Sequence, residues 1–226
     1  MKKGVKTIPN SCQKRICSKN RWIASLYDYR AANYDFLVHI LSLGMDFHYR
    51  KIAVERLLVR PGDWVLDIGC GTGLDLPSLS KKVGPKGRVV GVDLSERMLY
   101  FANRRILKER LRNVSLLLSD ASDLPFGTGS IQAVFCDYLL STVSAGKVMK
   151  EIFRIAVPGA SMVFADDRLP SGWFALPFKT MVDFFRDGYF NPALSEIKLL
   201  PDRLSSFKIT NHHGGLIYII SGIFKG

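Results

Sequence analysis

A short apolar run followed by a glycine-rich loop has the clearest chemical meaning in this sequence. The run at 64–68 leads into Gly69-Cys70-Gly71-Thr72-Gly73, in which three alternate residues lack a Cβ atom. Glycines of this kind permit a tight turn and let a ligand approach backbone N–H groups. A dinucleotide fingerprint would place glycine at position 74, where this chain has Leu74, and no Lys-Ser/Thr pair of a phosphate-binding loop follows. The pattern therefore disfavours a dinucleotide and a phosphoryl-transfer site.

Three acidic residues are spaced so that they would end successive strands. Asp67 precedes the glycines, Asp93 lies about twenty residues beyond the loop, and Asp120 ends the next apolar run, before Ala121. Carboxyl ends of parallel strands converge on one crevice, where Asp67 can pair with an ammonium, Asp93 with ribose hydroxyls and Asp120 with an adenine amino group. Each acid alone is typical of a helix or turn cap. The three acids together with the glycines predict a site for a nucleoside cofactor.

The elements that position these residues alternate between strands and helices. Strands are expected at 64–68, 88–92, 114–118, 131–136, 160–165, 206–210 and 216–221. Helices are expected at 22–43, 47–59, 74–83, 95–111, 147–156 and 192–199, with Ser95 as an N-cap and Pro158-Gly159 as a stop. Apolar strands alternating with helices predict an α/β fold with a parallel sheet covered on both faces. The short connection between the last two runs predicts an antiparallel C-terminal hairpin at one edge of the sheet.

Composition indicates one folded domain with a basic N-terminal arm. The 226 residues are 47% hydrophobic, and the net charge is +12, with no carboxylate before residue 22. We expect an arm at 1–21 and a single domain at 22–226. Within the domain, the N-terminal helices at 22–60 would lie over the site, and an insertion at 166–200 would lie on the substrate side. The arm could contact anionic lipid or nucleic acid, form a solvated terminus, or serve as a transit peptide. No run approaches the ~20 apolar residues of a membrane-spanning helix, and the four cysteines lack zinc spacing, so we expect no metal and a reduced, cytoplasmic protein.

Over residues 22–165 the chain resembles the class I S-adenosylmethionine-dependent methyltransferases. The glycine loop, the spaced acids, the Ser122–Phe126 segment and the Glu151–Gly159 segment carry this resemblance. It implies a Rossmann-like, mostly parallel seven-stranded sheet and S-adenosyl-L-methionine as cofactor. Asp67 and the loop would hold the methionine part and Asp93 the ribose. Leu94 and Met98 would flank the adenine, and Asp120 and Ala121 would bond to its edge. The residues that it assigns to the cofactor are Tyr34, Asp67, Gly69, Cys70, Gly71, Gly73, Asp93, Leu94, Met98, Asp120 and Ala121.

The segment at 27–50 is similar to the opening of the ubiquinone/menaquinone-biosynthesis C-methyltransferases. Those enzymes and the related phospholipid N-methyltransferases act on lipophilic acceptors. By this resemblance Tyr34 and Asp35 would lie over the cofactor, and Arg50 would help to place the first helices. The Asn/Asp-Pro-Pro-Tyr motif of the commonest base-methylating subclass is absent, because the chain reads Cys136-Asp137-Tyr138-Leu139 there.

Several residues are candidates for the acceptor side of the site. The aromatic segment at 173–190 is interpreted either as a lid over an apolar acceptor or as a core helix. The His212-His213 pair is interpreted either as a base toward a phenolic hydroxyl or as a solvated turn. The candidates for catalysis are Asp137, Tyr138 and His212, and those for acceptor binding are Tyr27, Arg50, Trp173 and Phe178.

The leading hypothesis is methyl transfer from S-adenosylmethionine to a lipophilic acceptor, either a quinol or polyprenyl-phenol ring or a phospholipid amine. An anionic membrane surface is a candidate partner through the basic arm, which would make the protein peripheral on a membrane. Nucleic acid is disfavoured as a partner, and the oligomeric state is left open. The alternatives are an RNA or small-molecule methyltransferase, and a non-catalytic binding protein that keeps the fold.

Overall fold

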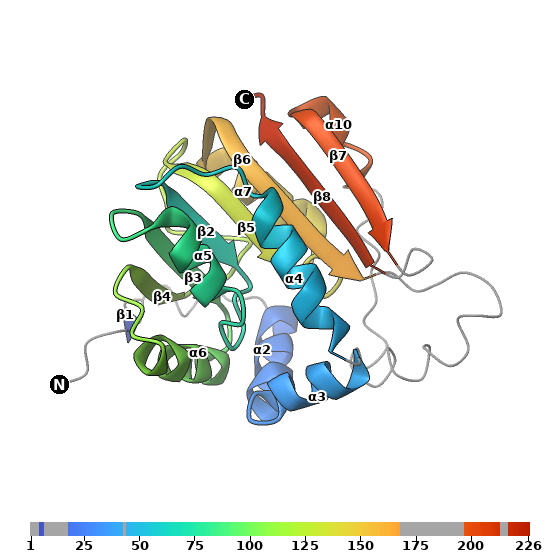
Figure 1. Ribbon diagram of the computed structural model, residues 1–226. Coiled ribbons are helices and arrows are strands. Elements are labelled where there is room, and N and C mark those ends of the chain that lie inside the picture. Colours follow the sequence, from blue (N-terminus) through green and yellow to red (C-terminus); the bar gives the residue numbers. More distant parts are fainter. Residues whose placement is uncertain (1–4, 7–17, 43, 168–196, 213–216) are drawn as a thin grey trace.

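The computed structural model describes residues 5–6, 18–42, 44–167, 197–212 and 217–226, and they build one mixed sheet flanked by helices (Figure 1). The sheet order is β1-β4-β3-β2-β5-β6-β8-β7. Neighbouring strands are parallel from β1 to β6, whereas β8 is antiparallel to both β6 and β7. The strands are β1 (Val5–Lys6), β2 (Trp64–Ile68), β3 (Arg88–Asp93), β4 (Val114–Leu118), β5 (Ile131–Asp137), β6 (Ala156–Asp167), β7 (Leu204–His212) and β8 (Ile217–Phe224). The predicted fold class and the antiparallel hairpin are confirmed, and the short strand β1 adds an eighth strand beside β4.

Apolar side chains on both faces of the central strands form two core layers. Leu66 of β2 packs in the layer that contains Ile152 of α7 (Ala145–Ile155) and Leu200 of α10 (Leu200–Arg203). The neighbouring Val65 points into the other layer, with Ala53 of α4 (Met45–Arg56). That layer also includes α5 (Leu76–Val83) and α6 (Glu96–Lys108). Burial on both faces explains why the strands read as continuous apolar runs rather than as alternating ones. None of the described helices is long and apolar enough to cross a membrane.

The predicted helix at 22–43 is wrong, because two helices occupy this region. They are α2 (Ser18–Arg30) and α3 (Tyr34–Leu41). The chain turns between them at Asn33, whose N–H donates to the carbonyl of Arg30 at 3.1 Å and which precedes α3 as its N-cap residue. Asparagine favours caps and turns over helix interiors. The break lets α2 and α3 take different directions at one end of the domain (Figure 1).

The helix predicted at 147–156 ends before Pro158-Gly159, at Ile155, but the next strand begins earlier than the expected residue 160, because β6 starts at Ala156 and passes through this pair. The register explains how the strand tolerates them. Ile131 of β5 pairs with Ala156, but Ala133 pairs with Ser161, so extra residues of β6 bulge out of the ladder between these two pairs. Gly159 has a φ of 87° inside this bulge, where a proline and a left-handed glycine are accommodated without losing the following pairs.

The remaining helix predictions hold to within a few residues where the structure describes the chain. The Oγ of Ser95 accepts a hydrogen bond from the N–H of Met98 at 3.0 Å, which confirms the predicted N-cap of α6. The aromatic segment with Trp173 and Phe178, most of the helix expected at 192–199, and His213 lie outside the described residues.

Candidate active site

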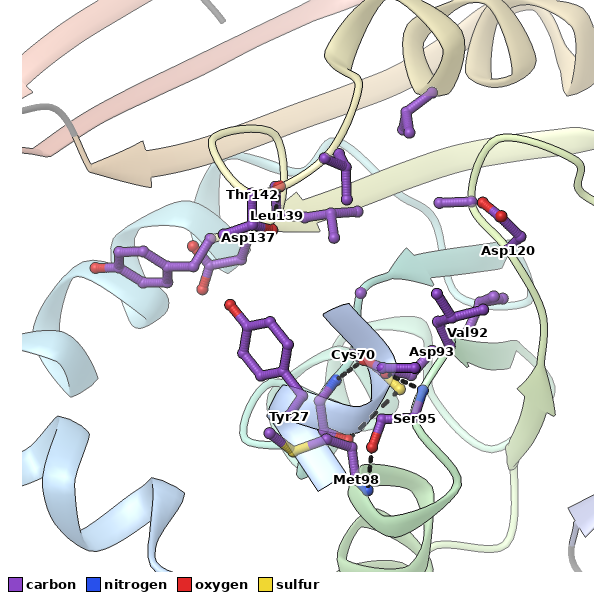
Figure 2. Close-up of a pocket in the computed structure, with 18 of the residues that line it drawn as sticks. Tyr27, Cys70, Val92, Asp93, Ser95, Met98, Asp120, Asp137, Leu139 and Thr142 are labelled. Atoms are coloured by element: carbon purple, nitrogen blue, oxygen red, sulfur yellow. Dashed lines mark hydrogen bonds between the residues drawn. The ribbon is translucent and has the colours of Figure 1, made fainter. Parts of the chain in front are cut away.

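A cavity of about 240 Å³ lies at the carboxyl ends of β2, β3, β4 and β5, where the loops after these strands meet α2, α3 and α4. Figure 2 shows Asp137, Leu139 and Thr142 on one side of it and Cys70, Asp93 and Met98 on another. The predicted residues that line the cavity are Tyr27, Tyr34, Arg50, Gly69, Cys70, Gly71, Asp93, Leu94, Met98, Asp120, Ala121, Asp137 and Tyr138. Residues that are far apart in the sequence therefore line one cavity.

The glycine loop needs glycine for two different physical reasons. Gly69, Gly71 and Gly73 have φ values of 77°, 52° and 78°, a region that side chains with a Cβ atom rarely adopt. A Cβ atom on Gly73 would also lie 2.7 Å from the Cδ1 atom of Leu76, whereas one on Gly71 would meet nothing closer than 4.0 Å. Gly73 is therefore required for packing beneath the loop. Gly71 keeps open the space on the cavity side.

Asp93 ends β3 and connects it to both neighbouring loops. Its Oδ2 accepts a hydrogen bond from the N–H of Gly71 at 2.8 Å, and its Oδ1 accepts one from the N–H of Ser95 at 2.9 Å. Burial raises the pKa of this carboxyl, and the backbone donors of Ser95 and Gly71 act in the opposite direction. A carboxylate oxygen has more than one acceptor site. Asp93 can therefore hold the loop in place and still accept hydrogen bonds from a ligand in the cavity.

Asp120 follows β4 and shapes the far end of the cavity. Its Oδ1 accepts hydrogen bonds from the N–H of Ser122 at 2.9 Å and from the Ser122 hydroxyl at 2.7 Å. This local turn holds Ala121 on the cavity wall. Asp120 acts both as the turn-forming acid and as a wall residue, so the two interpretations of its sequence position are compatible.

A buried guanidinium with three carboxylates around it forms one corner of the site. The Nε atom of Arg50 lies 2.9 Å from Asp46 Oδ2, and its Nη1 atom lies 2.5 Å from Asp75 Oδ2 and 2.6 Å from Asp137 Oδ2. Burial lowers the pKa of Arg50, but these acids outweigh it and the net shift is upward. Burial raises the pKa values of Asp67, Asp75 and Asp137, against the charge of Arg50. The corner therefore has more acid than base.

Two carboxylate oxygens of this corner have no hydrogen-bond partner among the described residues. They are the buried Oδ2 atom of Asp67 and Oδ1 atom of Asp137. Asp137 lines the cavity, whereas Asp67 lies behind its wall. An unpaired buried carboxylate is costly unless a cation or a proton satisfies it. The corner is suited to the positively charged part of a ligand.

Aromatic rings form the wall next to this corner. The guanidinium carbon of Arg50 lies 5.0 Å from the ring centre of Tyr138, which has the left-handed φ of 50°. The rings of Tyr27 and Tyr34 meet edge to face, with 6.2 Å between their centres. Burial raises the pKa values of Tyr34 and Tyr138. These phenols therefore stay neutral near neutral pH and offer a largely apolar surface.

The first helices are attached to the body of the domain by two acids whose partners the sequence does not reveal. The Oδ1 of Asp28 in α2 accepts hydrogen bonds from the Ser95 hydroxyl at 2.5 Å and from the N–H of Arg97 at 3.1 Å. In α3, Asp35 accepts one from Thr72 at 2.5 Å and one from Arg105 at 2.7 Å. The resemblance pointed to Asp35, but no sequence signal pairs Asp28 with a residue 67 positions away. Both acids hold their helices over the glycine loop and the α6 N-terminus.

His212 lies away from the cavity. Its Nε2 atom is 3.1 Å from the Thr210 hydroxyl, and its ring centre is 4.9 Å from that of Tyr49 in α4. It belongs to β7, the outermost strand on the side of the sheet remote from β3 and β4. Its side chain is not part of the cavity wall, so the structure does not bring this candidate base to the other predicted residues.

Comparison with known proteins places this geometry in context. Residues 15–173 match the ubiE/COQ5 methyltransferase family. The chain is 30% identical over 192 residues to the demethylmenaquinone methyltransferase of Lactobacillus johnsonii, covering 84% of this chain and 76% of that protein. It is 31% identical over 191 residues to the same-named protein of Lactococcus lactis, with 82% and 75% covered.

Solved structures share the fold at lower sequence identity. A SAM-dependent methyltransferase from Aquifex aeolicus superposes with a TM-score of 0.61 at 23% identity, covering 77% of this chain and 89% of that one. Geranyl diphosphate C-methyltransferase from Streptomyces coelicolor, in complex with Mg²⁺, geranyl-S-thiolodiphosphate and S-adenosyl-L-homocysteine, gives 0.65 at 18% identity, with 79% and 76% covered. Both likenesses concern the fold alone.

Proposed function

The chain belongs to the ubiE/COQ5 methyltransferase family and is an S-adenosylmethionine-dependent methyltransferase, and we propose that its acceptor is the ring of a lipophilic quinol or polyprenyl phenol. The observation that carries the proposal is one cavity that joins the predicted cofactor residues to a wall of neutral aromatic and aliphatic side chains. Relatives named demethylmenaquinone methyltransferase support a quinone-related acceptor. A phospholipid amine, an RNA and a polar small molecule are the alternative acceptors.

The residues around the cavity fit S-adenosylmethionine. Asp93 can accept hydrogen bonds from the ribose, and the open space at Gly71 leaves room for the ligand beside the loop. The unpaired oxygen of Asp67, behind the cavity wall, adds negative charge that suits the ammonium and sulfonium groups. Bound there, the cofactor would supply an electrophilic methyl group. Residues of this chain would then have to align an acceptor carbon and keep water away.

We assign to Asp137 the role of accepting a proton from the acceptor hydroxyl. The carboxyl lines the cavity, its Oδ2 is held 2.6 Å from Arg50, and its Oδ1 has no partner among the described residues. Burial raises its pKa, which makes the carboxylate a stronger base than an exposed one. Removing the hydroxyl proton would increase the electron density of the ring and favour attack by a ring carbon on the methyl group, whose bond to sulfur would break. The ring carbon would then lose its own proton to water, which restores the aromatic ring and leaves S-adenosylhomocysteine as the second product. Arg50 would keep Asp137 in one orientation throughout.

An acceptor screen tests the proposal. Purified protein is incubated with methyl-labelled cofactor and, separately, a reduced demethylated naphthoquinol with a short isoprenoid tail, phosphatidylethanolamine vesicles, and total RNA. We expect label only on a ring carbon of the quinol, identified by mass spectrometry of the product. Label on the phospholipid amine or on RNA, with none on the quinol, would overturn the proposed acceptor.

Two variants test the assigned residue. We expect Asp137→Asn to keep cofactor affinity within a few-fold and to lower turnover by roughly 10²–10⁴-fold, the usual contribution of a general base. Asp123→Asn is the matched control, because Asp123 is exposed and outside the cavity wall. Unchanged turnover in Asp137→Asn would remove Asp137 from the mechanism.

A further inference from the structure

Exposed apolar side chains are concentrated on the outer surface of the first three helices. Trp22, Tyr29, Phe36, Ile40 and Phe47 are 43%, 84%, 65%, 50% and 73% exposed. They are five of the eleven large hydrophobic side chains that are exposed in the described part of the chain, and they fall within 26 residues. Scattered exposed apolar residues need no explanation, but a concentration on neighbouring helices indicates an interaction site.

Most of the acidic residues of the same helices contact groups on the side that faces the domain. Residues 18–56 contain four carboxylates, those of Asp28, Asp35, Asp46 and Glu55, and Glu55 near the end of α4 is exposed. Asp28 accepts from Ser95 and Asp35 from Arg105, both in the body of the domain, and Asp46 accepts from the buried guanidinium of Arg50. Three of the four negative charges are therefore engaged on the side that faces the domain, and the fourth lies at the end of α4, far along the chain from α2.

Basic side chains remain on the outside. Arg21 of α2 and Lys51 of α4 are exposed, as is His39 of α3. Phe36 and Ile40 are four residues apart in α3 and so share one side of that helix. Figure 1 shows α2, α3 and the start of α4 gathered at one end of the domain. The outer surface there combines apolar and cationic side chains, a combination that is complementary to anionic lipid and its acyl chains.

We propose that this docking surface, formed by Tyr29, Phe36, Ile40, Phe47 and Lys51, binds an anionic lipid bilayer. The same helices contribute the cavity residues Tyr27 and Tyr34, which lie two residues before Tyr29 and Phe36. Docking would therefore place the cavity next to the membrane surface. If the acceptor is lipophilic, as proposed above, it can pass from the bilayer to the cavity without crossing water. Lipid binding itself does not depend on the identity of the acceptor.

Vesicle co-sedimentation tests the docking surface without any acceptor. The full chain is mixed with vesicles of phosphatidylcholine alone or of phosphatidylcholine with about 30% phosphatidylglycerol, whose charge gives the vesicle surface a strongly negative potential. We expect binding to the anionic vesicles and little to the neutral ones. The triple variant Phe36→Gln, Ile40→Gln, Phe47→Gln should bind at least about tenfold more weakly, because each apolar side chain that leaves water strengthens partition by roughly that factor. Lys51→Gln should weaken binding by a few-fold.

A matched triple variant controls for general loss of exposed apolar surface. Leu58→Gln, Leu107→Gln and Ile209→Gln replace side chains that are 67%, 66% and 42% exposed elsewhere in the domain. This variant should bind vesicles as the unchanged chain does. Equal binding by the two triple variants would overturn the proposal. A self-association equilibrium in sedimentation velocity that the first triple variant abolishes, without vesicle binding, would show that a second copy is the partner instead.

The outcome is separable from that of the acceptor screen. We expect the docking variant to methylate a short-tailed quinol in solution at the normal rate and a long-tailed quinol in vesicles at least about tenfold more slowly. Normal rates on both quinols would refute docking and leave the methyl acceptor proposal intact. Vesicle binding without methylation of either quinol would support the docking surface and overturn the proposed acceptor.

Discussion

Arg50→Gln is the most informative single change in the domain. It removes one guanidinium that lies within 2.9 Å of Asp46, Asp75 and Asp137. The four side chains are 11% exposed or less. Three buried carboxylates would then have no ion pair with a cation among the described residues. Removing one partner of a buried ion pair typically costs about 3–5 kcal/mol because the remaining charge is left without compensation.

A loss of that size is measurable against the whole stability of the domain. Domains unfold with a free energy of about 5–15 kcal/mol. For a chain of this length each kcal/mol corresponds to roughly 2–4 °C in melting temperature, so we expect a decrease of about 6–20 °C.

The loss should also depend on pH in a defined direction. Burial already raises the pKa values of Asp75 and Asp137 in the folded protein, and loss of Arg50 raises them further. A carboxyl whose pKa is higher in the folded than in the unfolded state binds more protons when folded, so stability falls as the pH rises through that interval. We therefore expect Arg50→Gln to lose more free energy of unfolding at pH 8 than at pH 5.5.

Urea unfolding at both pH values measures the effect. Arg88→Gln is the control, because the Arg88 guanidinium stacks 4.4 Å from the ring centre of Trp64 at the surface, and we expect it to cost less than about 1 kcal/mol. The double variant Arg50→Gln, Asp137→Asn should recover part of the loss. If Arg50→Gln and Arg88→Gln lost equal stability at both pH values, the account of this corner would be refuted.

Three further predictions concern the cofactor. Asp93→Asn should weaken the affinity for S-adenosylmethionine by about tenfold or more, since charged hydrogen bonds contribute about 1.5–3 kcal/mol; calorimetry that finds unchanged affinity would contradict its role. Because burial raises the pKa of Asp67, a cationic ligand should release a proton on binding, and its affinity should rise between pH 5.5 and 8; calorimetry in buffers of different ionisation enthalpy measures this. Asp35→Asn removes the charged contact with Arg105 and should cost less than about 1 kcal/mol of stability, because the side chain is partly exposed, yet weaken cofactor binding several-fold in the same titration.

Much of the site could be predicted from the sequence because local patterns determine it. The backbone conformation of the glycine loop follows from its residue types, because glycine readily adopts the positive φ values found at positions 69, 71 and 73. Asp93 and Asp120 could be placed because parallel strands bring their carboxyl ends to one edge, whatever packs around them. The seven predicted strands and the Ser95 cap follow from the same short-range rules.

Interactions between distant side chains could not be predicted in this way. Arg50 meets Asp75 and Asp137 at separations of 25 and 87 residues, and these contacts depend on how α4 lies across the sheet. His212 is a candidate base by its residue type, but it belongs to β7, which lies at the edge of the sheet remote from β3 and β4. The sequence by itself determined the fold class and the cofactor-facing loop, whose conformations are local. Only the tertiary structure decided which buried charges share a counter-ion and which surface is left apolar, because both depend on the relative placement of elements that no local pattern encodes.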